Sequence, residues 1–131
     1  MKKRPSLVDT NVILRYLLAD HPQLYEKAKD LFEKVRFGSE KVIILESVLT
    51  ECVYVLMKFY KVPKKEAADK LSSLLRYRGV ANEDKSILLE ALVIFAIQNI
   101  DMVDAILLAR ARIGQYNLIS FDKDVENNFE R

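Results

Sequence analysis

The chain has 131 residues, of which 50% are hydrophobic, and 21 basic and 19 acidic residues give it a formal charge of +2. With only 3 glycines and 3 prolines, this composition excludes a disordered tail and predicts one ordered domain over 1–131. A single cysteine, Cys52, rules out an internal disulfide and fits a reducing compartment. Pro5 and Asp9 interrupt the apolar run behind the basic start, and no charge-free stretch exceeds ten residues. We therefore expect a cytoplasmic protein without a membrane span.

Short apolar runs alternate with helical patterns along the chain. The first half predicts a strand over 5–9, a helix to about 18, a helix over 22–36, a strand over 41–45 and a helix from 47 or 50 to about 60. The second half predicts a helix to about 76, a short strand over 79–82, helices over 84–99 and 102–113, a strand over 117–121 and a short helical tail. Thr10 or Asn11 is the expected cap of the first helix.

This alternation predicts an α/β fold with three layers, α/β/α, and a short parallel sheet of four or five strands in a Rossmann-like topology. Such sheets bind ligands at the carboxyl ends of their strands. The sequence contains neither GxGxxG nor GxxxxGK[ST], so we expect no nucleotide cofactor.

Two acids follow predicted strands. Asp9 ends "SLVD" and Asp122 follows "LISF", so parallel strands would deliver both carboxylates to one edge of the sheet. Either residue alone is more simply explained as a helix cap or turn former. Their joint occurrence, each within an apolar frame, favours a functional site.

Three further acids lie on predicted helices. Glu51 flanks an apolar stripe through Val48, Cys52, Val55, Leu56 and Phe59, where it could equally be a boundary residue that reaches water. Asp101 and Asp104 are three residues apart at a helix start, so they share a face and could simply complement the helix N-terminus. That explanation suits Asp104 less well, because its neighbours are apolar and an unpaired buried charge is costly.

Several carboxylates close together in apolar surroundings repel one another, so a positively charged group is needed to stabilise them. The only histidine, His21, lies beside Pro22 in a predicted exposed loop, which excludes a His/Cys zinc site. An all-oxygen ligand set suits Mg²⁺ or Mn²⁺. These ions serve phosphoryl chemistry by activating water and stabilising the attacking and leaving oxygens.

Four motifs, in this order, resemble the PIN domain family and within it the short VapC-type toxins. They are "LVDTNVIL" with Asp9, "LTECVYVL" with Glu51, "DMVDAILLARA" with Asp104, and "LISFDKDV" with Asp122. The last two acids of the family are typically about eighteen residues apart, and here the separation is 18. The resemblance covers residues 6–125.

The resemblance implies a metal-dependent endoribonuclease. In such an enzyme, one or two Mg²⁺ or Mn²⁺ ions would be bound by four acids: Asp9, Glu51, Asp104 and Asp122. Asn11 and Ser120 would hold the acids or the substrate phosphate; Ser120 stands where relatives often have Thr. Thr10 and Asp101 would be supporting residues. Thr10 is equally well explained as a helix cap. Asp101 could be a metal ligand, a neighbour of the ligands or a partner of the helix dipole.

A ribonuclease needs cations beside its acids. The RNA-binding candidates are Arg15, one helical turn after Asn11, with Lys58 and Lys61 in the densest basic run; solvated helix ends explain each of them equally well. Core packing is the expected role for most of the aromatic residues that could stack on bases, namely Tyr16, Tyr54, Phe59 and Tyr60. The resemblance also implies a homodimer and a small antitoxin partner whose basic residues enter the acidic pocket.

Three alternative functions stay open beside a VapBC-type toxin. One is a PIN-domain nuclease for RNA processing that has no antitoxin. Another is a catalytically inactive PIN scaffold, which the presence of all four acids disfavours. The last is a receiver-like signalling module, which would need an adjacent pair of acids and a phosphoacceptor that "RGVANED" does not supply in the right frame.

Overall fold

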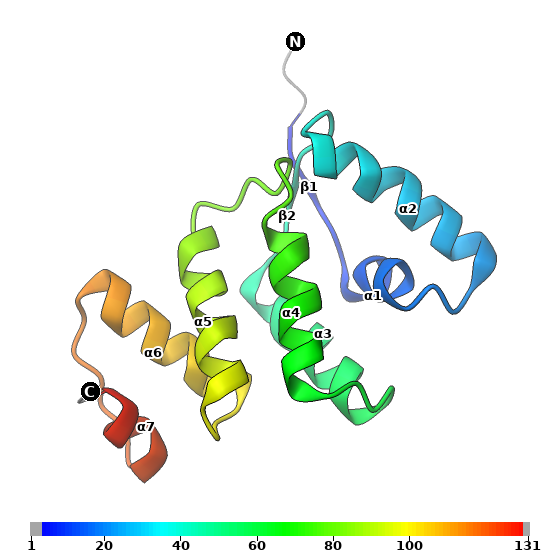
Figure 1. The fold of residues 1–131 in the computed structure, drawn as a ribbon. Helices are drawn as coiled ribbons and strands as arrows, with labels where there is room; N and C mark the ends of the chain where they lie inside the picture. The colour runs from blue at the N-terminus through cyan, green and yellow to red at the C-terminus, as the bar shows by residue number, and fades with distance from the viewer. Residues whose placement is uncertain (1–3, 130–131) are drawn as a thin grey trace. The chain divides into compact units, whose positions relative to one another are not determined.

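Two short parallel strands lie at the centre of the N-terminal half of the chain (Figure 1). In the computed structural model, which describes residues 4–129, β1 (Ser6–Leu7) pairs with β2 (Val42–Ile43). Val80 forms an isolated parallel bridge to Val42. Val42 and Val80 are both buried, whereas both residues of β1 are exposed, so β1 forms the exposed edge of this small sheet.

The predicted sheet of four or five strands is not found in the part of the chain that the structure describes. The predicted strand over 79–82 reduces to the bridge at Val80, and the segment 117–121 is extended chain outside any sheet. Its apolar run has a strand pattern, but a strand also needs a neighbouring backbone with free donors and acceptors. The elements described after residue 84 are all helices, whose backbone groups are already paired.

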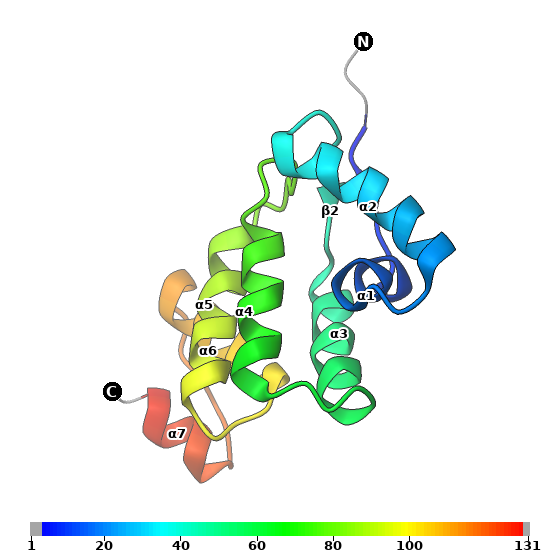
Figure 2. The ribbon, with the colours of Figure 1, turned by 45° about the vertical axis from the view of Figure 1, so that its right-hand side comes forward.

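Four helices complete the first unit (Figure 2). They are α1 (Thr10–Leu18), α2 (Pro22–Phe37), α3 (Glu46–Lys58) and α4 (Lys64–Leu75). Helix α1 packs against α2 and α3, and α3 packs against α4. Each lies within a few residues of its predicted range. Their buried faces include Ile13, Phe32, Val35, Leu49, Leu56, Leu71 and Leu75. These positions recur at helical spacing, which is why the helices could be predicted from the apolar pattern.

Three residues determine where α2 begins and ends. Pro22 is the first helical residue, and the Nδ1 atom of His21 accepts a hydrogen bond from the N–H of Leu24 at 3.3 Å. Gly38 ends the helix in the left-handed region with φ of 87°, a conformation that glycine adopts without a steric penalty. His21 is thus a capping residue on the surface, as its predicted loop position implied.

The segment after α4 runs back along β2. The N–H of Val42 donates to the carbonyl of Gly79 at 2.9 Å, and the N–H of Ala81 donates to the carbonyl of Val42 at 2.8 Å. One residue further, the side-chain amide of Asn82 pairs with both backbone groups of Ile44, at 2.9 and 2.7 Å. The Asn82 side chain therefore continues the pairing after regular strand structure has ended.

The chain divides into two compact units, one ending at Glu83 and one beginning at Asp84. The second unit contains α5 (Lys85–Ile97), α6 (Met102–Gly114) and α7 (Lys123–Phe129). Arg110 of α6 binds Asp84 at 3.2 Å, and Arg112 donates to the backbone carbonyl of Asn128 at 2.6 Å. These contacts fix the start of α5 and the end of α7 against α6.

Among residues 4–129, no helix is both long and apolar enough to cross a bilayer. One domain over 1–131 stays a prediction.

Gly79 is expected to tolerate no side chain. A Cβ atom there would meet the carbonyl oxygens of Glu40 and Val35 and the Cα atom of Val35, and all three belong to backbone. We expect Gly79→Ala to lower the free energy of unfolding by about 3 kcal/mol, measured by urea denaturation with circular dichroism.

Gly114→Ala is the matched control, because its Cβ would meet only the ring of Tyr116, an exposed side chain that can move. We expect this variant to remain within about 1 kcal/mol of the wild type. Equal effects of the two substitutions would contradict the close approach at Gly79.

Candidate active site

Asp9 links β1 to α1. It is the N-cap of α1, and its Oδ1 atom accepts a hydrogen bond from the N–H of Val12 at 3.2 Å. The predicted cap at Thr10 or Asn11 is therefore wrong: Thr10 is the first helical residue and is buried, and Asn11 follows it on the exposed side. A capping oxygen must precede the first helical residue, and Asp9 occupies that position. One capping bond leaves an exposed carboxylate with acceptor capacity for a cation.

Glu51 lies on the exposed side of α3. The buried residues of this helix are Leu49, Cys52, Val53 and Leu56. The predicted apolar stripe is therefore only partly correct, since Phe59 is 68% exposed. Glu51 lies outside the core, as a residue that binds a ligand must.

Asp9 and Glu51 act on the same buried thiol. Burial raises the pKa of Cys52 to about 12, and the negative charges of Glu51 and then Asp9 add to the increase. Both carboxylates belong to the first unit, Asp9 after β1 and Glu51 on α3. Their joint role in one site stays a prediction.

The second unit gathers the other acids. Asp101 is the N-cap of α6, and its Oδ1 atom accepts a hydrogen bond from the N–H of Asp104 at 2.9 Å. Burial raises the pKa of Asp104, and the charges of Asp101 and Asp122 and a side-chain hydrogen bond with Asp101 raise it further. Asp101 is thus a helix cap in contact with Asp104; whether it also neighbours a metal ligand stays a prediction.

Asp122 is held by the turn that precedes α7. Its Oδ1 atom accepts hydrogen bonds from the N–H groups of Asp124 and Val125, at 2.9 and 3.3 Å. The hydroxyl of Ser120 accepts a hydrogen bond from the N–H of Asp122 at 3.0 Å. Ser120 therefore supports the backbone of the acid, in line with the expected supporting role.

The donor chemistry of these acids suits a hard divalent cation. All the donors are carboxylate oxygens, and their mutual repulsion at Asp104 is the kind that a cation relieves. Within residues 4–129, however, no three His, Cys, Asp or Glu side chains converge closely enough to form a metal site. Asp9 and Glu51 belong to the first unit, and Asp101, Asp104 and Asp122 belong to the second.

The three predicted RNA-binding cations differ in their surroundings. Arg15 donates to the hydroxyl of Tyr60 at 3.0 Å and forms an ion pair with Asp20 at 3.2 Å. Arg15 is therefore engaged within the first unit. Lys58 and Lys61 are exposed, so their ammonium groups are accessible to a phosphate.

Core packing was expected for most of four aromatic residues, but three of them lie on the surface of α3 or just after it. Tyr54 is 55%, Phe59 68% and Tyr60 40% exposed. The rings of Tyr54 and Phe59 pack edge to face with centroids 6.2 Å apart. Tyr54 and Lys58 follow Glu51 by three and seven residues, a spacing that places all three on one helix face. That spacing was the available sequence signal for an exposed aromatic group.

Comparison with known proteins gives one match. The family model for the PIN domain matches residues 6–129, a range that includes all four predicted catalytic acids. No curated protein and no solved structure matches the chain. The family resemblance is confirmed; the VapC-type subgroup stays a prediction.

Asp104 is expected to lower stability when it is ionised. A carboxyl group whose pKa is raised by folding stabilises the folded state only while it is protonated. That contribution is complete below the ordinary value of 3.8 and is lost as the pH rises through the pKa of the folded state. In EDTA at neutral pH, Asp104→Asn should therefore raise the melting temperature by about 2–4 °C, and the difference should shrink below pH 3.8.

Glu126→Gln provides the control, because Glu126 is exposed on α7. It should leave the melting temperature unchanged at both pH values. An Asp104→Asn variant that melts with the wild type at every pH would show that the acids do not repel one another.

Proposed function

Because the chain belongs to the PIN domain family, whose members are generally nucleases, we propose that it is a metal-dependent endoribonuclease that hydrolyses RNA phosphodiester bonds. The observation that carries this proposal is the arrangement of acids within the second unit. Burial raises the pKa of Asp104, and the charges of Asp101 and then Asp122 raise it further. Acids that repel one another in a nuclease family suggest a cation-binding role.

We assign Mg²⁺ or Mn²⁺ to four ligands: Asp9, Glu51, Asp104 and Asp122. Nucleases of this family generally use divalent metals, and oxygen ligands alone favour these two ions. Thr10, Asn11, Asp101 and Ser120 are the supporting residues, and the hydrogen bonds of Asp101 and Ser120 are consistent with this role.

The bound cation and the protein's carboxylates would have different roles in hydrolysis. A bound divalent cation supplies Lewis acidity toward the phosphate and makes water more acidic. One carboxylate would orient the attacking water and accept its proton. Capping would keep the Asp9 carboxylate in place, since its Oδ1 atom is hydrogen-bonded to the N-terminus of α1.

The exposed face of α3 is suited to hold the RNA. Tyr54 and Phe59 offer exposed ring surface, and unpaired bases stack on such rings without sequence preference. Lys58 and Lys61 are placed to neutralise phosphates near these rings. This exposed face of α3 begins one helical turn from Glu51, so RNA bound there would pass close to the Glu51 carboxylate.

We further propose that the protein is the toxin of a VapBC-type pair, acts as a homodimer and is inhibited by a small antitoxin. The support is the order and spacing of the four motifs. Expression in a bacterial host should arrest growth, and Asp9→Asn should restore it. Co-expression of a small protein encoded beside this chain should also restore growth. Growth unaffected by wild-type expression would favour an RNA-processing nuclease.

Asp9→Asn is the sharpest test of the nuclease. Asparagine caps helices as well as aspartate does, so the variant should keep α1 while it loses the charge that binds the cation. We expect cleavage of a pool of structured RNAs in Mg²⁺ or Mn²⁺ to fall by about 100-fold or more, and to be absent in EDTA. The rate of loss of full-length RNA is the measurement.

Asp30→Asn is the matched control, because Asp30 is an exposed aspartate on α2. This variant should cleave like the wild type. Cleavage that survives EDTA or Asp9→Asn would argue against a metal nuclease centred on these acids. Circular dichroism would establish that both variants retain their helices.

A further inference from the structure

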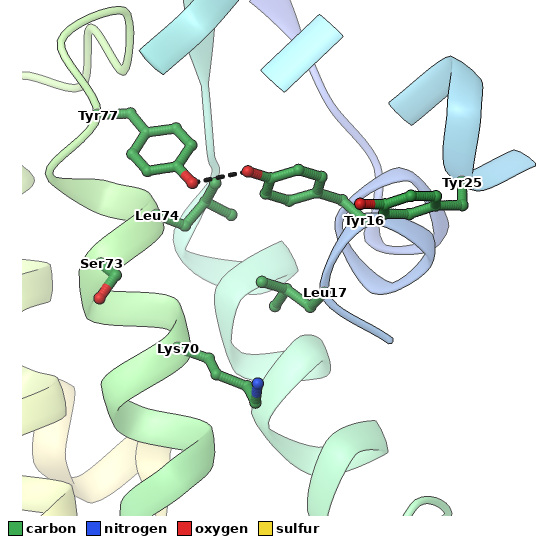
Figure 3. A pocket seen from close by; sticks show the side chains of 7 residues that line it. All are labelled: Tyr16, Leu17, Tyr25, Lys70, Ser73, Leu74 and Tyr77. Carbon is green, nitrogen blue, oxygen red and sulfur yellow. Dashed lines mark hydrogen bonds between the residues drawn. The ribbon is translucent and has the colours of Figure 1, made fainter. Parts of the chain in front are cut away.

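A hollow of about 330 Å³ lies between α1, α2 and the end of α4 in the first unit (Figure 3). Small-ligand sites usually begin at about this size. The residues that line it are Tyr16, Leu17, Tyr25, Lys70, Ser73, Leu74 and Tyr77. Tyr16 is one of the aromatic residues considered for base stacking, but none of the predicted catalytic residues or RNA-binding cations lies among them, so the proposed function leaves this hollow unexplained.

Aromatic side chains dominate its walls. The hydroxyls of Tyr16 and Tyr77 are hydrogen-bonded at 2.7 Å, and Tyr16 also packs on Phe32 with ring centroids 4.7 Å apart. These contacts hold two of the rings in place. Tyr25, on α2, takes part in none of the ring contacts found among residues 4–129. It is half-buried and can present ring surface to a ligand.

The polar groups of the hollow favour an anion. Lys70 extends from α4, and Ser73 follows it by three residues on the same helix (Figure 3). No carboxylate is among the lining residues, so the Lys70 ammonium has no acidic competitor in the wall. The guanidinium of Arg36 lies 6.0 Å from the ring centroid of Tyr77, a lining residue, and therefore adds positive charge close to the hollow. The matching ligand combines an aromatic plane with an anionic group.

We propose that this hollow binds one unpaired nucleotide of the RNA substrate. The base stacks on Tyr25, the phosphate pairs with Lys70, and the Ser73 hydroxyl donates a hydrogen bond to the nucleotide. A free nucleotide has the same chemistry, but the position of the hollow favours a strand. Tyr16 follows Asp9 by seven residues on α1, about 10 Å along the helix axis. A strand that crosses Asp9 can reach the hollow within a few nucleotides; this assignment therefore rests on the proposed function.

Binding measured without catalysis tests the assignment. The probe is a 5′-labelled unstructured RNA hexanucleotide in EDTA, and the readout is fluorescence anisotropy over a range of salt concentrations. Tyr25→Leu keeps an apolar side chain but removes the ring, and should weaken binding about tenfold. Lys70→Met should weaken binding and reduce the salt slope by about 0.7.

Lys65→Met is the matched control, because Lys65 is exposed on α4 and is not a lining residue. It should leave both the affinity and the salt slope unchanged, and Lys70→Arg should restore most of the affinity lost in Lys70→Met. Thermal melts of each variant separate loss of binding from loss of fold.

Three results would overturn the proposal. The first is wild-type affinity in both Tyr25→Leu and Lys70→Met. The second is binding of free adenosine or uridine monophosphate that these variants abolish while hexanucleotide affinity is unchanged, which would assign the hollow to a free nucleotide. The third is failure of the wild type to bind the hexanucleotide. Cleavage of the RNA pool in Mg²⁺ or Mn²⁺ would in each case show whether the proposed nuclease function survives.

Discussion

In the first unit, one side chain extends the hydrogen-bonded ladder of the sheet. Asn82 pairs with both the N–H and the carbonyl of Ile44, and so extends a ladder that begins where Val42 donates to the carbonyl of Gly79. This pairing fixes the chain between β2 and α3, which begins at Glu46. Because β1 pairs with β2, the strand that precedes Asp9 is linked to the segment that leads into α3 and Glu51. The elements that carry these two acids are therefore connected by backbone pairing.

The acids of the candidate site have a second, structural role. Asp9 and Asp101 are the N-caps of α1 and α6, and Asp122 accepts hydrogen bonds from the first backbone N–H groups of α7. A cap orients a carboxylate without consuming all of its acceptor capacity. Alanine at these positions would remove a cap and a charge together, at a cost in stability of about 1 kcal/mol. Asparagine separates the two roles, which makes it the more informative substitution.

The helices could be predicted because their apolar spacing is local, as Phe32 and Val35 of α2 illustrate. The sheet could not: the run before Asp122 has a strand pattern, but pairing depends on backbone from elsewhere in the chain. Capping at Asp9 was missed because a polar run of three offers several candidate oxygens, and only the first helical residue decides among them. Tyr54 and Phe59 were placed in the core because hydropathy does not report which side of a helix faces water. The family could be identified, since the order and spacing of the four acids survive these local errors; the role of each acid stays a prediction.

The burial of Cys52 has a practical consequence for spectroscopy. Its side chain is fully buried and the pKa of its thiol is raised to about 12, so at neutral pH it contains almost no thiolate, the form that reacts with maleimides and oxidants. The natural chain therefore needs no cysteine removal before labelling. Cysteines introduced at Lys27 and Lys123, both exposed, would carry a donor and an acceptor dye in different units. Energy transfer between the dyes could then follow the separation of the two units as RNA and a divalent cation are added.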